Sequence, residues 1–192
     1  TEMVKAVLQA SGLDYVIKLR NWDYGYNRAL NKKNHGIFCT TYTESRAPQF
    51  KWVGPLANNL WTIFAPAGTN LQIDDLEDTR GLLYAGYRGD VMTEYLLERG
   101  YKVSEMESDD LNPKRLELGQ VDLWIADQLA GPYFASQQDV EGLVPVYSFN
   151  KTALYLAMNM ETPDEVIQKL NQGLETIKNN GIYEAIETKY GL

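Results

Sequence analysis

The stretch NPKRLELGQVDLWIAD, residues 112 to 127, predicts a helix, a turn and a strand in quick succession. Its first half, NPKRLELG, is rich in helix formers and ends at Gly119. Its second half is a continuous apolar run that Asp127 closes, which is typical of a buried strand. A helix followed by such a strand is the repeating unit of α/β proteins with parallel sheets.

The same alternation continues along the chain in both directions. Helices are expected at residues 3–13, 21–34, 74–81, 90–100, 112–119 and 181–192, and another just after residue 127. A further helix is expected to begin with a capping box formed by Thr162, Pro163 and Glu165. Strands are expected at residues 14–20, 36–42, 50–54, 60–68, 82–87, 101–106, 121–127, 143–149 and 152–159. The predicted fold class is therefore α/β with largely parallel sheets.

Composition excludes some classes of function. The 192 residues carry a net charge of −8, which disfavours nucleic acid as a partner. A single cysteine, Cys39, allows no internal disulfide, and a single histidine, His35, allows no multi-histidine metal site. We expect no metal and no cofactor. No apolar run approaches the length of a membrane span, and the first residues, TEMVKAVLQASG, do not have the pattern of a signal peptide.

The order of these features resembles that of the bacterial extracellular solute-binding proteins of family 3, the polar amino-acid type. The matching segments are TTYTESR (40–46), FKWVGPL (50–56), LEDTRGLLYAGYRGD (76–90), LELGQVDLWIAD (116–127) and TPDEVIQKLNQGLETIKNNGIYEAIETKYG (162–191). The resemblance implies a two-lobed fold of the periplasmic-binding-protein type II, in which two crossing strands join two α/β lobes. We expect lobe one to be residues 1–58 and 150–192, and lobe two to be residues 59–149.

The chain departs from this family at its start. Family members usually open with a strand and a β-hairpin, whereas this chain begins at the first helix. The absent strand would be central in lobe one, and its loss would leave two strand edges unpaired. We expect that these residues were removed or not included, or that a partner supplies them; the protein is then a monomer, or a dimer if the partner is a second copy.

Two charged residues are the main candidates for ligand binding. Arg46 follows a predicted strand, and its planar guanidinium matches a carboxylate. By resemblance it binds the ligand's α-carboxylate, with hydroxyls from Thr41 and Thr43 beside it; the alternative is a surface arginine paired with Glu44. By resemblance Asp127 accepts from the α-ammonium of the ligand, although it could also cap the next helix.

Three further residues complete the predicted site. Gly89 lies in a turn before a helix, where free N–H groups favour an anion. Asp90 caps that helix or recognises a cationic ligand side chain. Trp22 could stack on a ligand, as could Trp52 and Tyr24, or these rings could pack within a lobe. Trp124 is expected in the core, Cys39 as a small buried residue, and His35 in a turn.

The resemblance implies a binding protein. It would take an amino acid or related carboxylate into the cleft between its lobes and deliver it to the membrane permease of an ABC transporter. Its location would be the periplasm or the outside of the cell. Two alternatives stay open: an enzyme similar to the cyclohexadienyl dehydratases, and the sensory domain of a signalling protein. The sequence does not name the ligand.

Overall fold

The computed structural model describes residues 1–190. Its helices are α1 (Glu2–Ser11), α2 (Trp22–Asn31), α3 (Val91–Glu98), α4 (Asn112–Glu117), α5 (Ala130–Gln137), α6 (Asp164–Asn179) and α7 (Ile182–Tyr190). Its strands are β1 (Gly36–Thr41), β2 (Phe50–Pro66), β3 (Leu83–Tyr87), β4 (Lys102–Met106), β5 (Leu123–Asp127) and β6 (Leu143–Asn159). Short 3₁₀ helices lie at Ala47–Gln49, Leu76–Thr79 and Asp109–Leu111.

The chain divides into two compact units. Unit 1 comprises Thr1–Asn58 together with the chain from Thr152 on, and unit 2 is Asn59–Lys151. The strands β2 and β6 each begin in one unit and end in the other. The hydrogen-bonded strand order is β1-β6-β2-β5-β3-β4. The expected α/β class is confirmed.

In two places the structure has one long strand where the sequence predicted two shorter ones. Residues 50–54 and 60–68 were expected to form separate strands, but β2 runs unbroken from Phe50 to Pro66. Likewise, 143–149 and 152–159 belong to one strand, β6. The prediction was wrong because turn-forming residues such as Gly54, Pro55 and Asn150 can sit within an extended strand when its neighbours continue the sheet.

The strand expected at residues 14–20 is absent. These residues follow α1 without regular structure, and no backbone hydrogen bond joins them to a strand among the residues described. The alternating pattern of DYVIKLR favours an extended chain, but a strand forms only when another strand completes its hydrogen-bond ladder. This prediction was wrong for lack of a pairing partner within the described chain.

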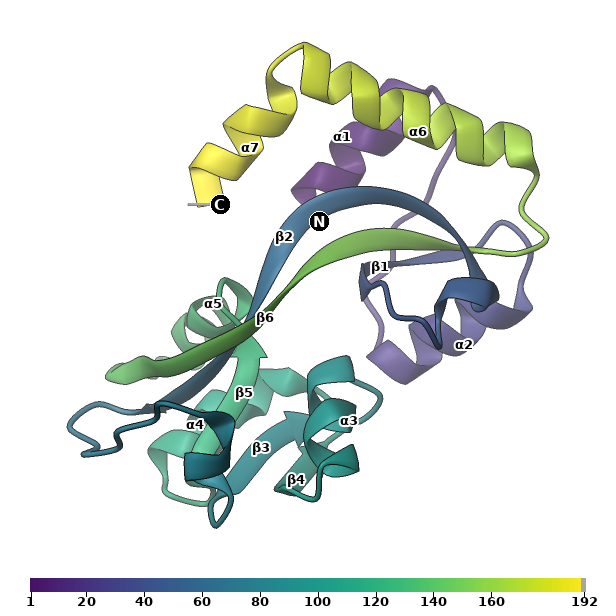
Figure 1. Cartoon of the computed structure of the whole chain (residues 1–192). Helices are drawn as coiled ribbons and strands as arrows, with labels where there is room; N and C mark the ends of the chain where they lie inside the picture. Colours follow the sequence, from purple (N-terminus) through teal and green to yellow (C-terminus); the bar gives the residue numbers. More distant parts are fainter. Residues whose placement is uncertain (191–192) are drawn as a thin grey trace. The chain divides into compact units, whose positions relative to one another are not determined.

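In unit 1, helices cover both faces of the strands. α1, α6 and α7 contribute apolar side chains to a core with Val53 and Leu56 of β2 and Leu156 and Met158 of β6. The helices lie along this face in Figure 1. On the other face, Ala29 of α2 packs with residues of β1, β2 and β6. The start of α1 and the end of α7 meet here, because Lys189 and Tyr190 both bond to Glu2.

A close approach of α1 and α6 depends on Gly173, which is buried in α6. A side chain there would place its Cβ 2.5 Å from the Val7 carbonyl oxygen and 3.0 Å from the Ser11 nitrogen. Those atoms are backbone and cannot rotate away. The helices can therefore pack this closely only with glycine at this position.

We expect Gly173→Val to destabilise the protein by about 2–3 kcal/mol, because α6 must move away from α1. Urea unfolding followed by circular dichroism measures this loss. Gln172→Val, one residue earlier and exposed, is the matched control and should change stability by well under 1 kcal/mol. Equal losses in both variants would contradict the packing argument.

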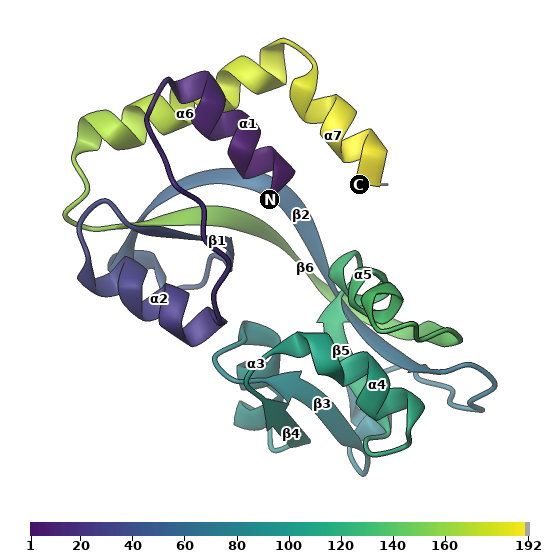
Figure 2. The same ribbon diagram turned by 180° about the vertical axis from the view of Figure 1, so that it is seen from behind.

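Unit 2 is a sheet covered by helices on both faces. Residues that alternate along β2 and β5 face opposite cores: Ile63 and Ile125 pack with Leu96 of α3, whereas Phe64 and Trp124 pack with Leu116 of α4. Figure 2 shows these short helices around β3, β4 and β5. The predicted core position of Trp124 is confirmed, since the side chain is fully buried.

Strand direction differs between the units. In unit 2, β3 pairs parallel to both β4 and β5, as expected, while β2 pairs antiparallel to β5. In unit 1, β1 pairs antiparallel to β6, so the expectation of a mostly parallel sheet does not hold for this pair. The difference follows from the connections, because parallel strands in unit 2 are joined through helices, whereas β6 crosses back from the other unit.

Most helix ends follow the sequence signals, with one exception. Gly12 and Gly100 follow α1 and α3 with φ of +66° and +78°, as C-terminal glycines do. The capping box expected at Thr162 is wrong: Pro163 is the N-cap of α6, and no side chain caps it. Thr162 is instead buried before the helix, where its carbonyl oxygen accepts from Lys51. The last two residues of the expected final helix, 191–192, lie outside the described residues.

Candidate ligand-binding site

Arg46 lies in a turn that follows β1 in unit 1. The carbonyl oxygen of Thr43 accepts hydrogen bonds from Arg46 N at 3.1 Å and from Ala47 N at 2.8 Å. The Thr43 hydroxyl also accepts from Arg46 N, at 3.2 Å. Threonine and serine favour such turns because their hydroxyls bond to nearby backbone groups. The turn therefore fixes the backbone from which the arginine side chain extends.

The Arg46 side chain is buried among aromatic rings. The residue is 7% exposed, so the alternative of a surface arginine is wrong. Its guanidinium carbon lies 5.9 Å from the ring centroid of Trp22 and 5.3 Å from that of Tyr26, within the range of a cation–π contact. The structure thus brings Trp22 and Arg46 together, as the predicted site requires.

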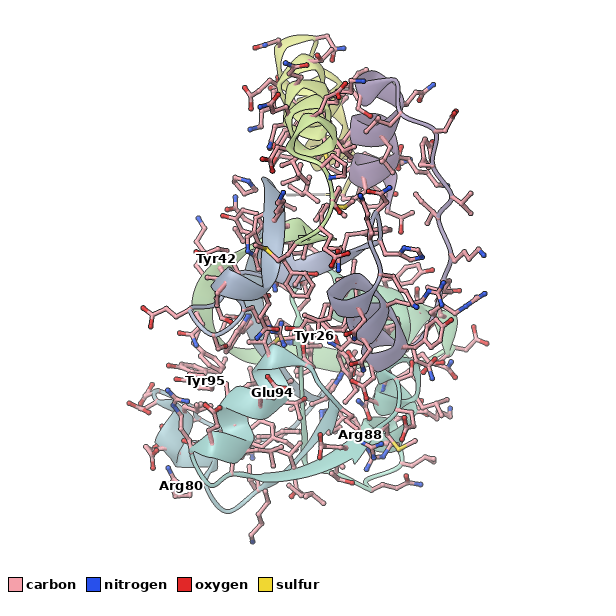
Figure 3. The ribbon with its side chains drawn as sticks, turned by 90° about the vertical axis from the view of Figure 1, so that its right-hand side faces the viewer. Tyr26, Tyr42, Arg80, Arg88, Glu94 and Tyr95 are labelled. Atoms are coloured by element: carbon pink, nitrogen blue, oxygen red, sulfur yellow. The ribbon has the colours of Figure 1, made fainter. Side chains whose placement is uncertain are left out.

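Tyr26, labelled in Figure 3, is a neighbour of Arg46 that the sequence analysis missed. It lies one turn after Trp22 on α2, and the two ring centroids are 5.9 Å apart. Its hydroxyl donates to Gln49 Oε1 at 2.9 Å, and Gln49 Nε2 donates to the Ser45 carbonyl oxygen at 2.9 Å. The spacing of four residues on a predicted helix was the signal that could have identified it.

The two predicted threonines differ in their surroundings. Thr41 is the last residue of β1 and is buried, close in sequence to the Arg46 turn. The Thr43 hydroxyl bonds to Arg46 N and lies 3.0 Å from the Ser45 hydroxyl. In the structure, Thr43 therefore holds the turn that carries the arginine.

The other aromatic candidates pack within unit 1. Trp52 donates from Nε1 to the Ala47 carbonyl oxygen at 3.1 Å, and its ring meets Tyr42, Phe50 and Tyr155 edge-on. Tyr24 is half exposed and pairs with Arg28, whose guanidinium carbon is 5.8 Å from its ring centroid. The packing interpretation holds for Trp52. Tyr24 contacts Arg28 instead of Arg46.

Cys39 was expected to be buried but is exposed. The β1–β6 register shifts between Phe38 and Thr40, so the chain bulges at Cys39 and turns its side chain outward. His35 lies between α2 and β1, as expected, and its Nδ1 is 3.1 Å from the Lys33 carbonyl oxygen.

In unit 2, Gly89 and Asp90 form the turn between β3 and α3. Gly89 has φ +74°, the left-handed region that favours glycine. Asp90 is the N-cap of α3 and is buried; its Oδ2 accepts from Met92 N and Thr93 N, both at 3.0 Å. The capping interpretation of Asp90 is confirmed, and it places a carboxylate at the positive end of the helix dipole.

Asp127 ends β5 and is half-buried. Its Oδ1 accepts from Leu129 N at 2.7 Å and from Ala130 N at 3.0 Å, so the capping interpretation holds here too. Burial raises the pKa of Asp127, and these two backbone bonds lower it in part. Its second oxygen, Oδ2, has no hydrogen-bond partner within residues 1–190 and could accept from a cation.

Strand order brings the unit 2 candidates to one edge. β3 and β5 are parallel neighbours with Tyr84 opposite Leu123, so their carboxyl ends, before Gly89 and at Asp127, meet at the same edge of the sheet. Ligands of open α/β sheets bind at this edge. Unit 1 thus contains the buried guanidinium of Arg46. Unit 2 contains the N-termini of α3 and α5 and the half-buried carboxylate of Asp127.

Other kinds of site find less support. Within the described chain, no cluster of three or more acidic, cysteine or histidine side chains could hold a metal ion. In the same residues, no helix is both long and apolar enough to cross a membrane. Asp122 has a structural role, since its Oδ2 accepts from Leu83 N at 2.8 Å.

Comparison with solved structures defines the class of fold. The chain superposes on a histidine kinase sensor domain similar to periplasmic binding proteins, with a TM-score of 0.87, 25% identity, and coverage of 98% of this chain and 83% of that one. It is similar, at 20% identity, to the arginine-, lysine-, histidine-binding protein ArtJ of Geobacillus stearothermophilus, with a TM-score of 0.85 and coverage of 98% and 83%. The fold is therefore that of the periplasmic binding proteins, as the resemblance implied.

A curated relative has a similar sequence. The chain is 24% identical over 195 residues to a probable histidine-binding protein of Neisseria gonorrhoeae, covering 98% of this chain and 72% of that protein. No protein-family model matches the chain.

Proposed function

We propose that this protein binds a small polar solute that carries a carboxylate, most simply an amino acid. The observation that carries the proposal is Arg46, which is 7% exposed and whose guanidinium lies over the rings of Trp22 and Tyr26, after the carboxyl end of β1. A guanidinium has a planar fork of donors that matches a carboxylate bidentately.

In this proposal, unit 2 binds the other end of the ligand. An α-ammonium group would donate to Asp127 Oδ2, while Thr41 and Gly89 would add contacts near the carboxylate. A zwitterion held by one cation and one acid leaves no net buried charge, which limits the cost of excluding water. A ligand that contacts both units stabilises only the conformation in which both reach it, so binding shifts a conformational equilibrium.

The relatives support an amino acid as the ligand. The names of the Neisseria and Geobacillus proteins give histidine, arginine and lysine as their ligands. These three amino acids share an α-carboxylate and an α-ammonium group and differ in their side chains. We therefore propose the shared backbone groups as what Arg46 and Asp127 recognise, and a cationic amino acid as the first ligand to test.

We further propose that the protein works outside the cytoplasmic membrane and passes its ligand to the permease of an ABC transporter. A sensory role is the second candidate, because the sensor domain of a histidine kinase superposes with a TM-score of 0.87. Both roles need the same ligand site. Binding is favoured over dehydratase chemistry because the relatives named above are binding proteins and a sensor domain.

The test is a thermal-shift screen of the twenty amino acids, followed by calorimetry. At a free ligand concentration of about 100 times Kd, binding should stabilise the folded protein by about 2.7 kcal/mol. At least one amino acid should raise the melting temperature by several degrees. If none does at millimolar concentration, and prephenate or arogenate is converted to an aromatic product, the binding proposal fails and the enzyme alternative replaces it.

Asp127→Asn separates ligand binding from helix capping. Asparagine keeps an oxygen for Leu129 N and Ala130 N but removes the negative charge. We expect the calorimetric Kd for an amino acid to rise at least tenfold, while the melting temperature without ligand changes little. Asp122→Asn, at an acid that bonds to backbone on a different part of unit 2, should leave the Kd unchanged.

A further inference from the structure

A cavity of about 330 Å³ lies in unit 2, between α5, the loop that follows it and the strands β2 and β5. Phe64 and Trp124 line it, with their ring centroids 5.4 Å apart, and Ala135 and Val140 add further apolar surface. Small-molecule sites have volumes of about 300–1,000 Å³, so this cavity is at the lower end of the range. It is large enough for a small organic ligand.

This cavity is separate from the proposed amino-acid site. None of Arg46, Gly89 and Asp127 lines it. Phe64 pairs with Trp124 on β5, and Asp127 ends that strand three residues later, a distance of about 10 Å along an extended chain. The cavity can therefore hold a different molecule from the one proposed to bind at Arg46.

The loop beside the cavity is fixed to the end of α5. Val140 N donates to the Ala135 carbonyl oxygen at 3.0 Å, and Asp139 N donates to the Ser136 carbonyl oxygen at 3.4 Å. This pair of hydrogen bonds is the Schellman motif, which ends many helices. The part of the cavity wall that the loop contributes is thus held by the backbone.

Asp139 occupies a position in this motif that costs stability. It is the C′ residue, which is usually glycine, and its φ is +52°, in the left-handed region that disfavours most side chains. It also follows the C-terminal end of α5, where the helix dipole is negative, and the last turn of α5 has no basic residue. A cation bound beside Asp139 would offset this electrostatic cost.

The charged groups around the cavity are all negative. Of the described residues that line it, Asp139 and Glu141 are acids, and none is lysine, arginine or histidine. Neither acid forms an ion pair within residues 1–190. A molecule in the cavity therefore meets apolar side chains together with two carboxylates that lack a counter-charge.

We propose that this cavity is a second binding site, and that its ligand is a small amine with an aromatic or aliphatic body. The body would pack against Phe64, Val140 and Leu143. The ammonium group would donate to the carboxylates of Asp139 and Glu141. The same two acids would repel a carboxylate on the ligand, so simple amines are favoured over amino acids. This inference does not rest on the proposed function.

Phenethylamine is the probe, and phenethyl alcohol, which has the same aromatic body without the positive charge, is its control. In NMR spectra of the isotope-labelled protein, phenethylamine should shift the amide signals of Ser136, Asp139 and Gly142, with a Kd of about 1 mM or lower. The alcohol should bind about tenfold more weakly. Unmoved signals at about ten times the expected Kd would overturn the proposal, and so would equal binding of the alcohol.

Asp139→Gly separates the role of the charge from that of the helix end. Glycine adopts the left-handed conformation without cost and removes the acid from the end of α5, so the melting temperature should rise by about 1–3 °C. The Kd for phenethylamine should nevertheless rise about tenfold, because one of the two carboxylates is lost. Glu98→Gln, which removes an acid from the end of α3, should leave this Kd unchanged. A wild-type Kd in Asp139→Gly would refute the assignment.

Ser136→Phe tests the cavity itself. Ser136 is exposed and lines the cavity, so a phenyl ring at this position would occupy the space of the ligand. We expect this variant to keep its fold, checked by its melting temperature, and to lose phenethylamine binding. Gln137→Phe, at the next residue, which is exposed and does not line the cavity, should bind as the wild type does. If Ser136→Phe binds phenethylamine with the wild-type Kd, the ligand lies elsewhere and the proposal is wrong.

Discussion

Replacing Arg46 by alanine is expected to weaken amino-acid binding by about 2–5 kcal/mol, the largest effect of any single change in the proposed site. The loss is large because the ligand carboxylate would enter a buried place without its counter-charge. The aromatic side chains of Trp22 and Tyr26 would remain, so shape alone would not restore binding. Calorimetry with the amino acid that stabilises the wild type most measures the change.

Two further arginine variants sharpen this test. Arg46→Lys keeps the charge but loses the planar fork, and should bind with an affinity between those of the wild type and the alanine variant. Arg28→Ala is the matched control, because the Arg28 guanidinium also lies over the ring of a tyrosine of α2, at 5.8 Å, but at the surface. An unchanged affinity in Arg46→Ala, or an equal loss in Arg28→Ala, would refute the role assigned to Arg46.

The second large effect concerns pH. Burial raises the pKa of Asp109 to about 7. Two hydrogen bonds that Asp109 accepts, from Asn112 Nδ2 at 2.7 Å and from Trp124 Nε1 at 2.8 Å, lower this pKa but do not outweigh burial. The nearby acids Asp90 and Asp110 add to the rise. Asp109 is 8% exposed in the helix turn before α4. Protonation therefore favours the folded state.

The sign follows from proton counting. Between pH 3.8, the ordinary pKa, and about 7, the folded protein holds a proton on Asp109 that the unfolded chain has lost. This contribution to stability is complete below about pH 4 and is lost as the pH rises through about 7, for a total of about 4 kcal/mol. Stability should thus fall between pH 5 and pH 8 more steeply in the wild type than in a variant without this carboxyl.

Asp109→Asn provides that variant, since an amide oxygen can still accept from Asn112 and Trp124. Urea unfolding at pH 5 and pH 8 measures the free energy of unfolding of both proteins. Between these two pH values, the free energy of unfolding of the variant relative to the wild type should rise by several kcal/mol. Asp110→Asn, exposed on the same turn, is the control and should keep most of the wild-type pH dependence, because Asp110 is the smallest of the causes that shift the Asp109 pKa. Parallel pH profiles for the wild type and Asp109→Asn would contradict the buried-proton account.

Local signals in the sequence were enough for most elements of the fold. Helices α1 and α3 end just before Gly12 and Gly100, within the expected ranges 3–13 and 90–100, and the apolar run to Asp127 formed β5. These predictions succeeded because helix ends and buried strands depend on the residues within them. The capping alternative held for both Asp90 and Asp127 for the same reason.

Features that depend on distant residues were predicted less well. The sequence pattern favoured a strand at 14–20, but no strand in the described chain pairs with it. The exposed position of Cys39 arises from a register shift against β6, more than 100 residues away. The sequence around Thr162 predicted a helix cap, but its side chain is buried and its carbonyl oxygen accepts from Lys51.

The sequence by itself determined the alternation of helices and strands, and it identified Arg46 and Asp127 at the ends of strands. Only the tertiary structure decided that Arg46 is buried against Trp22 and Tyr26, and that β2 and β6 each run as one strand through both units. The physical reason is range: turns, caps and apolar periodicity act over a few residues, whereas burial and strand pairing depend on which distant segments become neighbours.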